Sequence, residues 1–295
     1  WAAAEESELE SIRKRGVYEE VDVKLVPQGA VCVPVALLYS IKECGRRKVR
    51  AVALGNRVEA KDTENVYSPV PRLPNIRLLP RVAISLDMDI EQYDVKTAFL
   101  YADLEEEVFV RPPRHWCEPG RCWRLKKALY GLRQAPAAGS RTLAKKIQEA
   151  GWKVSEYEPS LFYHPEAKVY LLAYVDDLLF LGKKENIAKV RGSVLDHFEH
   201  TACEPEVGPN GGKVFTFLGL RMTVKNRRVA LSQRKLVEKI LEDFDPKGEI
   251  KPRKYPVSKM EVRAFEQDKD SDLRTKVVAA TYRKFVGSLN YLNTA

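Results

Sequence analysis

The chain has 295 residues, of which 44% are hydrophobic and 31% charged, with a formal net charge of +9 and a pI of about 9.2. This composition is that of a folded globular protein, and no apolar run approaches the roughly 20 residues needed to span a bilayer. The positive charge favours a polyanionic partner, most often nucleic acid, although a solvated surface also explains it. The acidic start lacks Met and a secretory signal, which suggests a piece of a longer reading frame, and the five unevenly spaced cysteines are typical of reduced thiols. We therefore expect an intracellular protein, cytoplasmic or nuclear, without a membrane anchor.

Runs of charged and apolar residues predict the first elements. Residues 5–15 are typical of a short charged helix, and residues 31–41 are apolar and favour a β-strand. A cationic run over residues 46–50 then enters an apolar run over residues 51–54. The solvated edge of a strand is one interpretation of that run.

Carboxylates end two further predicted strands. Residues 89–95 read as a strand that ends near Asp94, and two apolar runs between residues 169 and 182 flank Asp176-Asp177. The second pattern predicts a β-hairpin with two acids at its tip. Acids are common in turns for backbone reasons alone, but crowded like charges are costly unless a cation neutralises them. If the strands are neighbours, three carboxylates could hold two Mg²⁺ ions about 3.5–4 Å apart, a geometry suited to phosphoryl transfer.

The second half of the chain is expected to add helices and one more hairpin. Pro136 suits the first turn of a helix that should end near Ala150, before Gly151. Residues 215–224 and 228–231 suggest a second hairpin.

Two more helices are expected at the C-terminal end. Ser232 should cap a helix over residues 233–244, and another should run over about residues 279–292. The basic residues between them could follow a phosphate backbone or form a solvated loop; they are Lys247, Lys251, Arg253 and Lys254.

Two clusters of histidine and cysteine are weak zinc candidates, because neither has a standard four-ligand spacing. One comprises His115, Cys117 and Cys122, and the other His197, His200 and Cys203.

Three longer blocks carry a resemblance to a known family. They are Tyr93-Asp94-Val95-Lys96-Thr97-Ala98-Phe99-Leu100, Leu125-Lys126-Lys127-Ala128-Leu129-Tyr130-Gly131-Leu132-Arg133-Gln134-Ala135-Pro136 and Tyr174-Val175-Asp176-Asp177. Shorter blocks occur in the family's order, among them Tyr67-Ser68-Pro69-Val70, Ser160-Leu161-Phe162, Phe217-Leu218-Gly219 and Leu231-Ser232-Gln233. Together these blocks resemble the reverse transcriptase of Ty1/copia-type LTR retrotransposons, a segment of a Pol polyprotein, over roughly residues 46–295.

The resemblance implies an α+β fold of the right-hand polymerase type, with fingers, an antiparallel-sheet palm and a helical thumb. Residues 1–45 would be a lead-in that matches the family poorly beyond Trp1 and Glu8. The other expected ranges are 46–83 and 112–136 for the fingers, 84–111 and 137–233 for the palm, and 234–295 for the thumb.

The resemblance also implies an RNA-directed DNA polymerase, a nucleotidyltransferase that extends a primer with deoxynucleotides on an RNA or DNA template. Two Mg²⁺ ions would be held by Asp94, Asp176, Asp177 and the backbone carbonyl of Val95. The incoming dNTP would meet Lys48, Arg50, Phe99, Tyr130 and Gly131, and the primer would meet Phe217, Leu218 and Gly219. Phe99 would exclude nucleotides that carry a 2′-hydroxyl, although an ordinary core residue is the alternative.

The sequence departs from the family at two positions. Gly139-Ser140 stands where an aromatic pair is expected, and Ala102 replaces a usual Gly. The small pair is expected to leave a void or to let a neighbour such as Trp152 collapse inward.

Two other functions stay open. The chain could be a decayed transposon relic that binds nucleic acid without polymerising, or a two-metal nuclease. The RNase H and integrase segments of such polyproteins are expected partners that are absent from this chain.

Overall fold

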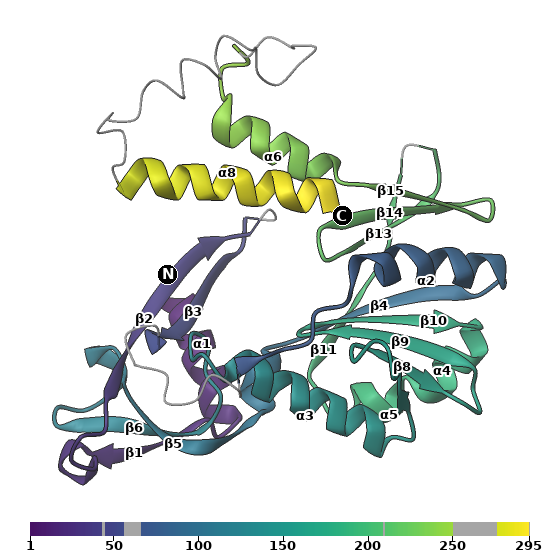
Figure 1. The fold of residues 1–295 in the computed structure, drawn as a ribbon. Helices are drawn as coiled ribbons and strands as arrows, with labels where there is room; N and C mark the ends of the chain where they lie inside the picture. The colour runs from purple at the N-terminus through teal and green to yellow at the C-terminus, as the bar shows by residue number, and fades with distance from the viewer. Residues whose placement is uncertain (43–44, 56–65, 209, 250–275, 295) are drawn as a thin grey trace. The chain divides into compact units, whose positions relative to one another are not determined.

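The computed structural model describes residues 1–42, 45–55, 66–208, 210–249 and 276–294 (Figure 1). The chain divides into two compact units, Trp1–Glu204 and Pro205–Ala295. Helices and largely antiparallel sheets occur in both, so the expected α+β class is confirmed. None of the helices in the described ranges is both long enough and apolar enough to cross a membrane.

The first sheet of unit 1 has five strands in the order β1-β6-β5-β2-β3. The strands are β1 (Tyr18–Asp22), β6 (Arg121–Lys127), β5 (Asp103–Arg111), β2 (Cys32–Ile41) and β3 (Arg47–Ala53). Only the β2–β5 pair is parallel. Helix α1 (Ala2–Lys14) lies against the edge strand β3, and its Leu9 and Ile12 enter a core that includes Trp123. The 3-10 turns η1 (Val23–Leu25) and η5 (Arg114–Trp116) lie between strands.

The second sheet of unit 1 has six antiparallel strands in the order β11-β4-β10-β9-β8-β7. They are β11 (His200–Cys203), β4 (Asp89–Val95), β10 (Asp177–Gly182), β9 (Val169–Tyr174), β8 (Leu161–His164) and β7 (Lys153–Val154). The strands β9 and β10 are largely apolar on both sides, and Leu171, Leu172, Leu178 and Leu179 are fully buried. Such strands must be covered on both faces.

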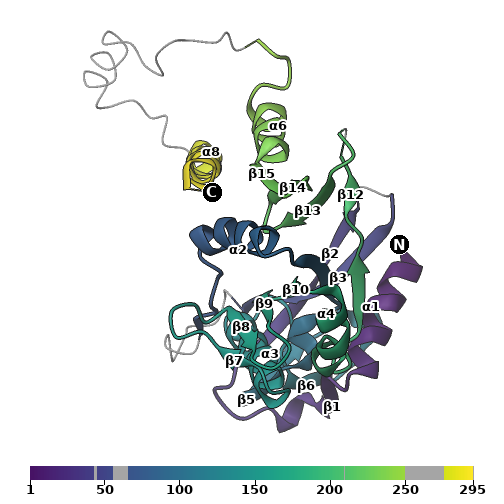
Figure 2. The same cartoon turned by 90° about the vertical axis from the view of Figure 1, so that its right-hand side faces the viewer.

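Helices cover both faces of this sheet, with α2 on one side and α3 and α5 on the other (Figures 1 and 2). The helices are α2 (Leu73–Ser85), α3 (Ala135–Glu149), α4 (Lys184–Val190) and α5 (Gly192–Leu195). Leu143 and Ile147 of α3 pack in one core cluster with Phe180. As expected, α3 has Pro136 in its first turn and is followed by Gly151 at φ +87°, which a side chain would strain.

Unit 2 has a four-stranded antiparallel sheet in the order β12-β13-β14-β15. The strands are β12 (Glu206–Val207), β13 (Lys213–Phe217), β14 (Leu220–Lys225) and β15 (Arg228–Ser232). Helices α6 (Arg234–Phe244) and α8 (Lys276–Thr294) pack through Phe244 and Phe285, whose ring centroids are 4.7 Å apart. Lys284 Nζ and Asp243 Oδ2 form an ion pair at 2.8 Å beside them.

The predicted elements agree with the structure except in the 215–232 region. The expected single strand over residues 215–224 is wrong, because the chain reverses at Leu218 and Gly219 and forms both β13 and β14. Leu218 has φ +50° and Gly219 φ +77°, the pair of positive values typical of a type I′ hairpin turn. Ser232 Oγ accepts a hydrogen bond from Arg234 N at 3.2 Å, one residue before the helix cap at Gln233. Three of the basic residues expected between the two C-terminal helices, Lys251, Arg253 and Lys254, lie outside the described residues.

The division of the chain falls inside one predicted domain. The expected palm range of 137–233 crosses the boundary between Glu204 and Pro205, so that β12 to β15 cluster with the helices expected to form the thumb. The assignment of fingers, palm and thumb stays a prediction.

Candidate active site

Strand pairing brings the predicted carboxylates to one end of the second sheet. Asp177, at the start of β10, is the direct cross-strand partner of Asp94 in β4. The backbone N–H of Val95 donates to the carbonyl of Asp176 at 2.7 Å. Because paired residues in antiparallel strands point to the same face, the Asp94 and Asp177 side chains share one face, next to that of Gln92.

The turn that carries Asp176 is strained. Tyr174 pairs with Asp177, so that Val175 and Asp176 form a two-residue hairpin loop. Val175 has φ +52°, the sign that the first loop position of a type II′ turn requires, although glycine is usual there and a β-branched residue is an outlier. Backbone strain of this kind costs on the order of 1–3 kcal/mol and is concentrated at functional sites.

Burial and repulsion from neighbouring carboxylates raise the pKa values of both acids in the hairpin turn, Asp176 and Asp177. Burial raises the pKa of Asp177 to about 6, and the Asp94 carboxylate contributes in the same direction, whereas a hydrogen bond from Gln92 opposes the rise. Burial and Asp94 also raise the pKa of Asp176, against a hydrogen bond from the Ala98 backbone and the charges of Arg50 and Lys48. A cation at this end of the sheet would relieve both groups.

The candidate ligand atoms are of the kind that binds a hard divalent cation, but in the part of the chain that the structure describes the side chains are not grouped around one metal position. All the candidate ligands are oxygens, as Mg²⁺ prefers. Within the described residues, Asp176 Oδ1 is buried without a hydrogen-bond partner, so it is a free acceptor. In the same part of the chain, however, no three histidine, cysteine, aspartate or glutamate side chains converge on one metal position. The binding of metal by the three expected carboxylates stays a prediction, and Asp177 Oδ1 lies 3.4 Å from Gln92 Nε2.

Cations from the first sheet lie near this acidic end. The guanidinium carbon of Arg50 is 5.7 Å from the centroid of the Tyr130 ring. Lys48, two residues earlier in β3, is partly buried, and burial followed by repulsion from Arg50 lowers its pKa while Asp94 opposes that shift. Burial, with the Asp176 charge, raises the pKa of the Tyr130 hydroxyl. The cations expected to meet the dNTP, Lys48 and Arg50, thus interact electrostatically with two of the expected metal ligands, Asp94 and Asp176.

Phe99 and Tyr130, both expected to meet the incoming dNTP, are neighbours. Their ring centroids are 5.3 Å apart and their planes are at 74°, an edge-to-face contact rather than a parallel stack. Phe99 is the second residue of the 3-10 turn η4 (Ala98–Tyr101). This turn begins directly after Thr97, which has φ +54°.

Gly131 is required by the protein itself. It has φ +86°, and a Cβ there would be 2.1 Å from the carbonyl oxygen of Ala53. The neighbouring Tyr130 carbonyl accepts the Ala53 N–H at 2.7 Å. The backbone at this glycine thus lies close to strand β3, and its contact with a nucleotide stays a prediction.

The small residues in α3 do not leave a void at Gly139. A Cβ at Gly139 would be 2.8 Å from Cδ1 of Phe99, so the Phe99 ring fills this space. Trp152 shares a core cluster with Leu143 and Ile147 of α3, and its ring centroid is 5.2 Å from that of His164 and 5.9 Å from that of Phe180. The expected cavity is therefore absent at Gly139, because a ring from η4 lies there, whereas the expectations for Ser140 and for Trp152 stay predictions.

The predicted primer-binding residues are in unit 2. Phe217 ends β13 and is fully buried, and Leu218 with Gly219 makes the turn into β14. The hydroxyl of Tyr291 in α8 donates to the Leu218 carbonyl, so this turn is held by the C-terminal helix.

Two of the three histidines in the zinc candidates have partners outside the candidate ligand sets. His115 Nε2 is 2.9 Å from Glu5 Oε2, and His200 Nδ1 is 2.9 Å from the carbonyl of Phe198.

Sequence reasoning missed Gln92 as a neighbour of the acidic site. The alternation of side chains along β4 could have found it, because residues 92 and 94 point to the same face of a strand.

The model of one protein family, reverse transcriptase (RNA-dependent DNA polymerase), matches residues 17–259. The chain is 31% identical over 270 residues to the retrovirus-related Pol polyprotein from transposon TNT 1-94 of Nicotiana tabacum, covering 86% of this chain and 19% of that protein. It is 31% identical over 262 residues to the Pol polyprotein from transposon RE1 of Arabidopsis thaliana, covering 84% and 16%. The Ty1-DR4 Gag-Pol polyprotein of Saccharomyces cerevisiae is 30% identical over 174 residues, covering 58% and 10%. The chain thus spans less than a fifth of these polyproteins.

Among solved structures, the chain is similar to a foamy viral protease–reverse transcriptase in complex with double-stranded DNA. The identity is 13% and the TM-score 0.45, over 89% of this chain and 38% of that one.

Proposed function

The chain belongs to the reverse transcriptase family, with Ty1/copia-type Pol polyproteins among its relatives, and from this premise we propose that it is an RNA-directed DNA polymerase. It would extend the 3′ end of a primer with deoxynucleotides on an RNA or DNA template. The RNase H and integrase segments expected in such a polyprotein would act beside it.

One observation carries the proposal. Asp94 and Asp177 are direct cross-strand partners, and Asp176 is in the adjoining turn. Arg50 and Lys48 are close enough to oppose the rise in the pKa of Asp176. Acids that hold metal ions, next to cations that bind phosphates, are what phosphoryl transfer requires.

The metal ligands in this proposal are the carboxylates of Asp94, Asp176 and Asp177 and the backbone carbonyl of Val95. Two bound Mg²⁺ ions would supply charge stabilisation at the α-phosphate and promote loss of the proton from the primer 3′-hydroxyl. The unpartnered Asp176 Oδ1 and the raised pKa of Asp177 support this assignment.

The other residues of the chain bind and orient the substrates. Arg50 and Lys48 would neutralise the triphosphate of the dNTP. Phe99, held against Tyr130, would lie at the sugar and exclude a 2′-hydroxyl, and Gly131 would lie beside the templating base. Phe217, Leu218 and Gly219 would contact the end of the primer.

Primer extension tests the proposal. The purified chain should extend a labelled DNA primer on an RNA template when dNTPs and Mg²⁺ are present and should stop when EDTA is added. Extension on a DNA template, run in parallel, measures template preference.

The same assay separates the alternatives. A relic would bind the primer–template duplex without extending it, and a two-metal nuclease would shorten the strands. Either result, obtained with folded protein, would contradict the polymerase assignment.

A further inference from the structure

Helix α1 buries two charged side chains, although it lies in the region that matches the family least. Glu8 is 8% exposed, and the side chain of Arg15, the residue after the helix, is 9% exposed. Glu8 and Arg15 are seven residues apart, which places them on one side of the helix about 10.5 Å from each other. Burying charges is costly unless they are paired or hydrogen-bonded, so each needs a specific partner.

The partner of Glu8 is the strand that carries the proposed triphosphate-binding cations. Glu8 Oε1 accepts the backbone N–H of Ala51 at 3.0 Å. Ala51 directly follows Arg50, and β3 is the edge strand of its sheet. The Glu8 carboxylate also lies within electrostatic reach of Lys48 and Arg50. Glu8 therefore holds the backbone beside Arg50 and complements the two cations.

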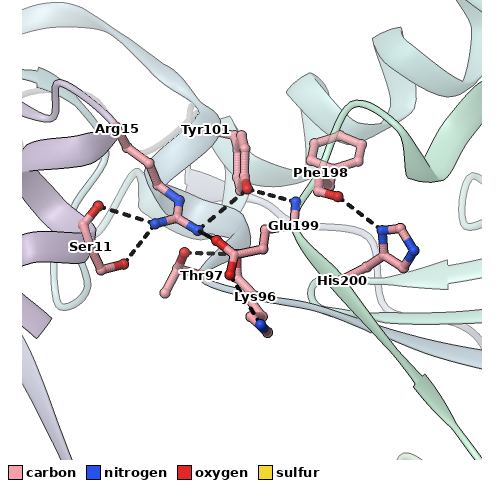
Figure 3. Close-up of polar contacts among 8 residues, drawn as sticks. All are labelled: Ser11, Arg15, Lys96, Thr97, Tyr101, Phe198, Glu199 and His200. Carbon is pink, nitrogen blue, oxygen red and sulfur yellow. Dashed lines mark hydrogen bonds and ion pairs between the residues drawn. The ribbon is translucent and has the colours of Figure 1, made fainter. Parts of the chain in front are cut away.

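The partner of Arg15 is Glu199, which precedes strand β11 (Figure 3). Arg15 Nη2 is 2.7 Å from Glu199 Oε2, and Arg15 Nη1 donates to Ser11 Oγ at 2.7 Å. The guanidinium carbon of Arg15 lies 5.2 Å from the centroid of the Tyr101 ring, and the Tyr101 hydroxyl accepts the Glu199 N–H at 2.8 Å.

Glu199 in turn contacts the chain just after Asp94. Lys96 Nζ is 3.0 Å from Glu199 Oε1, and the Lys96 backbone N–H donates to the Glu199 carbonyl at 2.7 Å. Lys96 is two residues after Asp94, and Glu199 is two residues before Thr201, the cross-strand partner of Asp94. Displacement of Glu199 would therefore displace the end of β4.

We infer that α1 fixes the separation between the cationic strand β3 and the Asp94 end of β4, with Glu8 and Arg15 as positioning residues for polymerisation. This inference rests on the proposed function, because Arg50 and Asp94 matter together only if one substrate meets both. Glu8 acts through Arg50 and so on dNTP binding. Arg15 acts through Glu199 on Asp94 and so on the chemical step.

Steady-state primer extension tests the two roles separately. Arg15→Gln should lower kcat about tenfold with little change in the KM for dNTP, since small displacements of a reacting group are costly. Glu8→Ala should raise that KM about tenfold, and Glu8→Gln should restore it, because the amide oxygen still accepts the Ala51 N–H. Arg13→Gln is the matched control, since Arg13 is on the same helix, is 54% exposed and faces Glu6 at 3.8 Å.

Amide hydrogen exchange provides a readout that does not depend on activity. Arg15→Gln should speed exchange at Lys96, and Glu8→Ala should speed exchange at Ala51, whereas Arg13→Gln should change neither. If wild-type protein fails to extend primers, the proposed function is wrong, and exchange alone decides whether α1 holds these segments. Unchanged exchange overturns the inference, as does an active enzyme whose kcat and KM ignore these substitutions or whose Glu8→Gln variant is as impaired as Glu8→Ala.

Discussion

Asp176 carries a carboxylate whose charged form is disfavoured by its surroundings. Its carboxylate is partly buried beside Asp94, one oxygen lacks a hydrogen-bond partner within the described residues, and its pKa is raised. A group in this environment is unfavourable for stability, which is expected when it serves a function instead. Its removal should therefore affect activity far more than folding.

Asp176→Asn keeps the shape of the side chain and removes its charge. We expect primer extension to fall nearly to zero, while affinity for a primer–template duplex and the melting temperature stay close to the wild-type values. Asp89→Asn, an exposed change at the other end of the same β4–β10 pair, should leave extension intact. Normal extension by Asp176→Asn would rule out the two-metal assignment.

Phe99→Val tests the proposed selection of the sugar. The smaller side chain would open space beside Tyr130, so the ratio of ribonucleotide to deoxynucleotide incorporation should rise. The ratio is measured by competition in one reaction, which corrects for a general loss of activity. An active variant with an unchanged ratio would make Phe99 a packing residue only.

Glu8→Gln should change the pH dependence of stability. Burial raises the pKa of Glu8 above 4.5 in the folded state, so the charged form is disfavoured by folding. Wild-type protein therefore loses stability relative to the neutral variant as pH rises from 4.5 through the folded-state pKa, and well below 4.5 the difference no longer changes with pH. Urea unfolding at pH 4.5 and 7.5 measures this, with the exposed Glu10→Gln on the same helix as the control. A difference that shrinks with rising pH would contradict the prediction.

Sequence reasoning found the residues whose chemistry is local and missed those that act through long-range contacts. Asp94, Asp176 and Asp177 follow from strand ends and turn patterns. Glu8 and Arg15 look like ordinary residues of a charged surface helix, and only the fold brings them to Ala51 and Glu199, the latter 184 residues from Arg15 in the sequence. No local pattern carries that information.

At the scale of elements, predictions held where periodicity was clear. Strands β4, β9 and β10 and helix α3 occur where expected. The error at residues 215–224 arose because Leu218 has no turn preference of its own, yet it forms the turn with Gly219, and its carbonyl accepts a hydrogen bond from the Tyr291 hydroxyl. The packing at Gly139 could not be predicted from local sequence either, because the ring beside it belongs to Phe99, forty residues earlier in the chain.

Gly139→Ala tests how tightly α3 packs on η4. Alanine in a helix normally gains about 1 kcal/mol over glycine, but a Cβ 2.8 Å from Phe99 Cδ1 forces one of them to move. We expect a net loss of about 1–3 kcal/mol in the free energy of unfolding, and a larger loss for Gly139→Trp with Ser140→Tyr.

Two further variants serve as controls for Gly139→Ala. Adding Phe99→Val to Gly139→Ala should recover part of the loss, because the ring no longer opposes the methyl group. Gly287→Ala in α8, where a Cβ meets no atom within 4 Å, should be neutral or stabilising. A stabilising effect of Gly139→Ala alone would restore the idea of a void in α3.

At the scale of the whole chain, unit 1 contains everything in the proposed catalytic site and both clusters of its core. The two sheets, α1, the three carboxylates and the nucleotide-contacting residues all precede Pro205. The proposed primer contacts, Phe217 to Gly219, are in unit 2. Catalysis would then require both units, although folding of the first should not.

Residues 1–204 should therefore fold without residues 205–295. All four tryptophans, Trp1, Trp116, Trp123 and Trp152, are in unit 1, so tryptophan emission reports on this unit in both the truncated and the full chain. We expect the truncated chain to show the same emission maximum and a cooperative melt, because among the described strands none of unit 2 pairs with the sheets of unit 1. Its affinity for a primer–template duplex should fall at least about tenfold, which corresponds to roughly 1.4 kcal/mol of lost contacts. Emission typical of exposed tryptophan would show that unit 1 needs unit 2 to fold, and unchanged duplex affinity would remove residues 217–219 from the primer site.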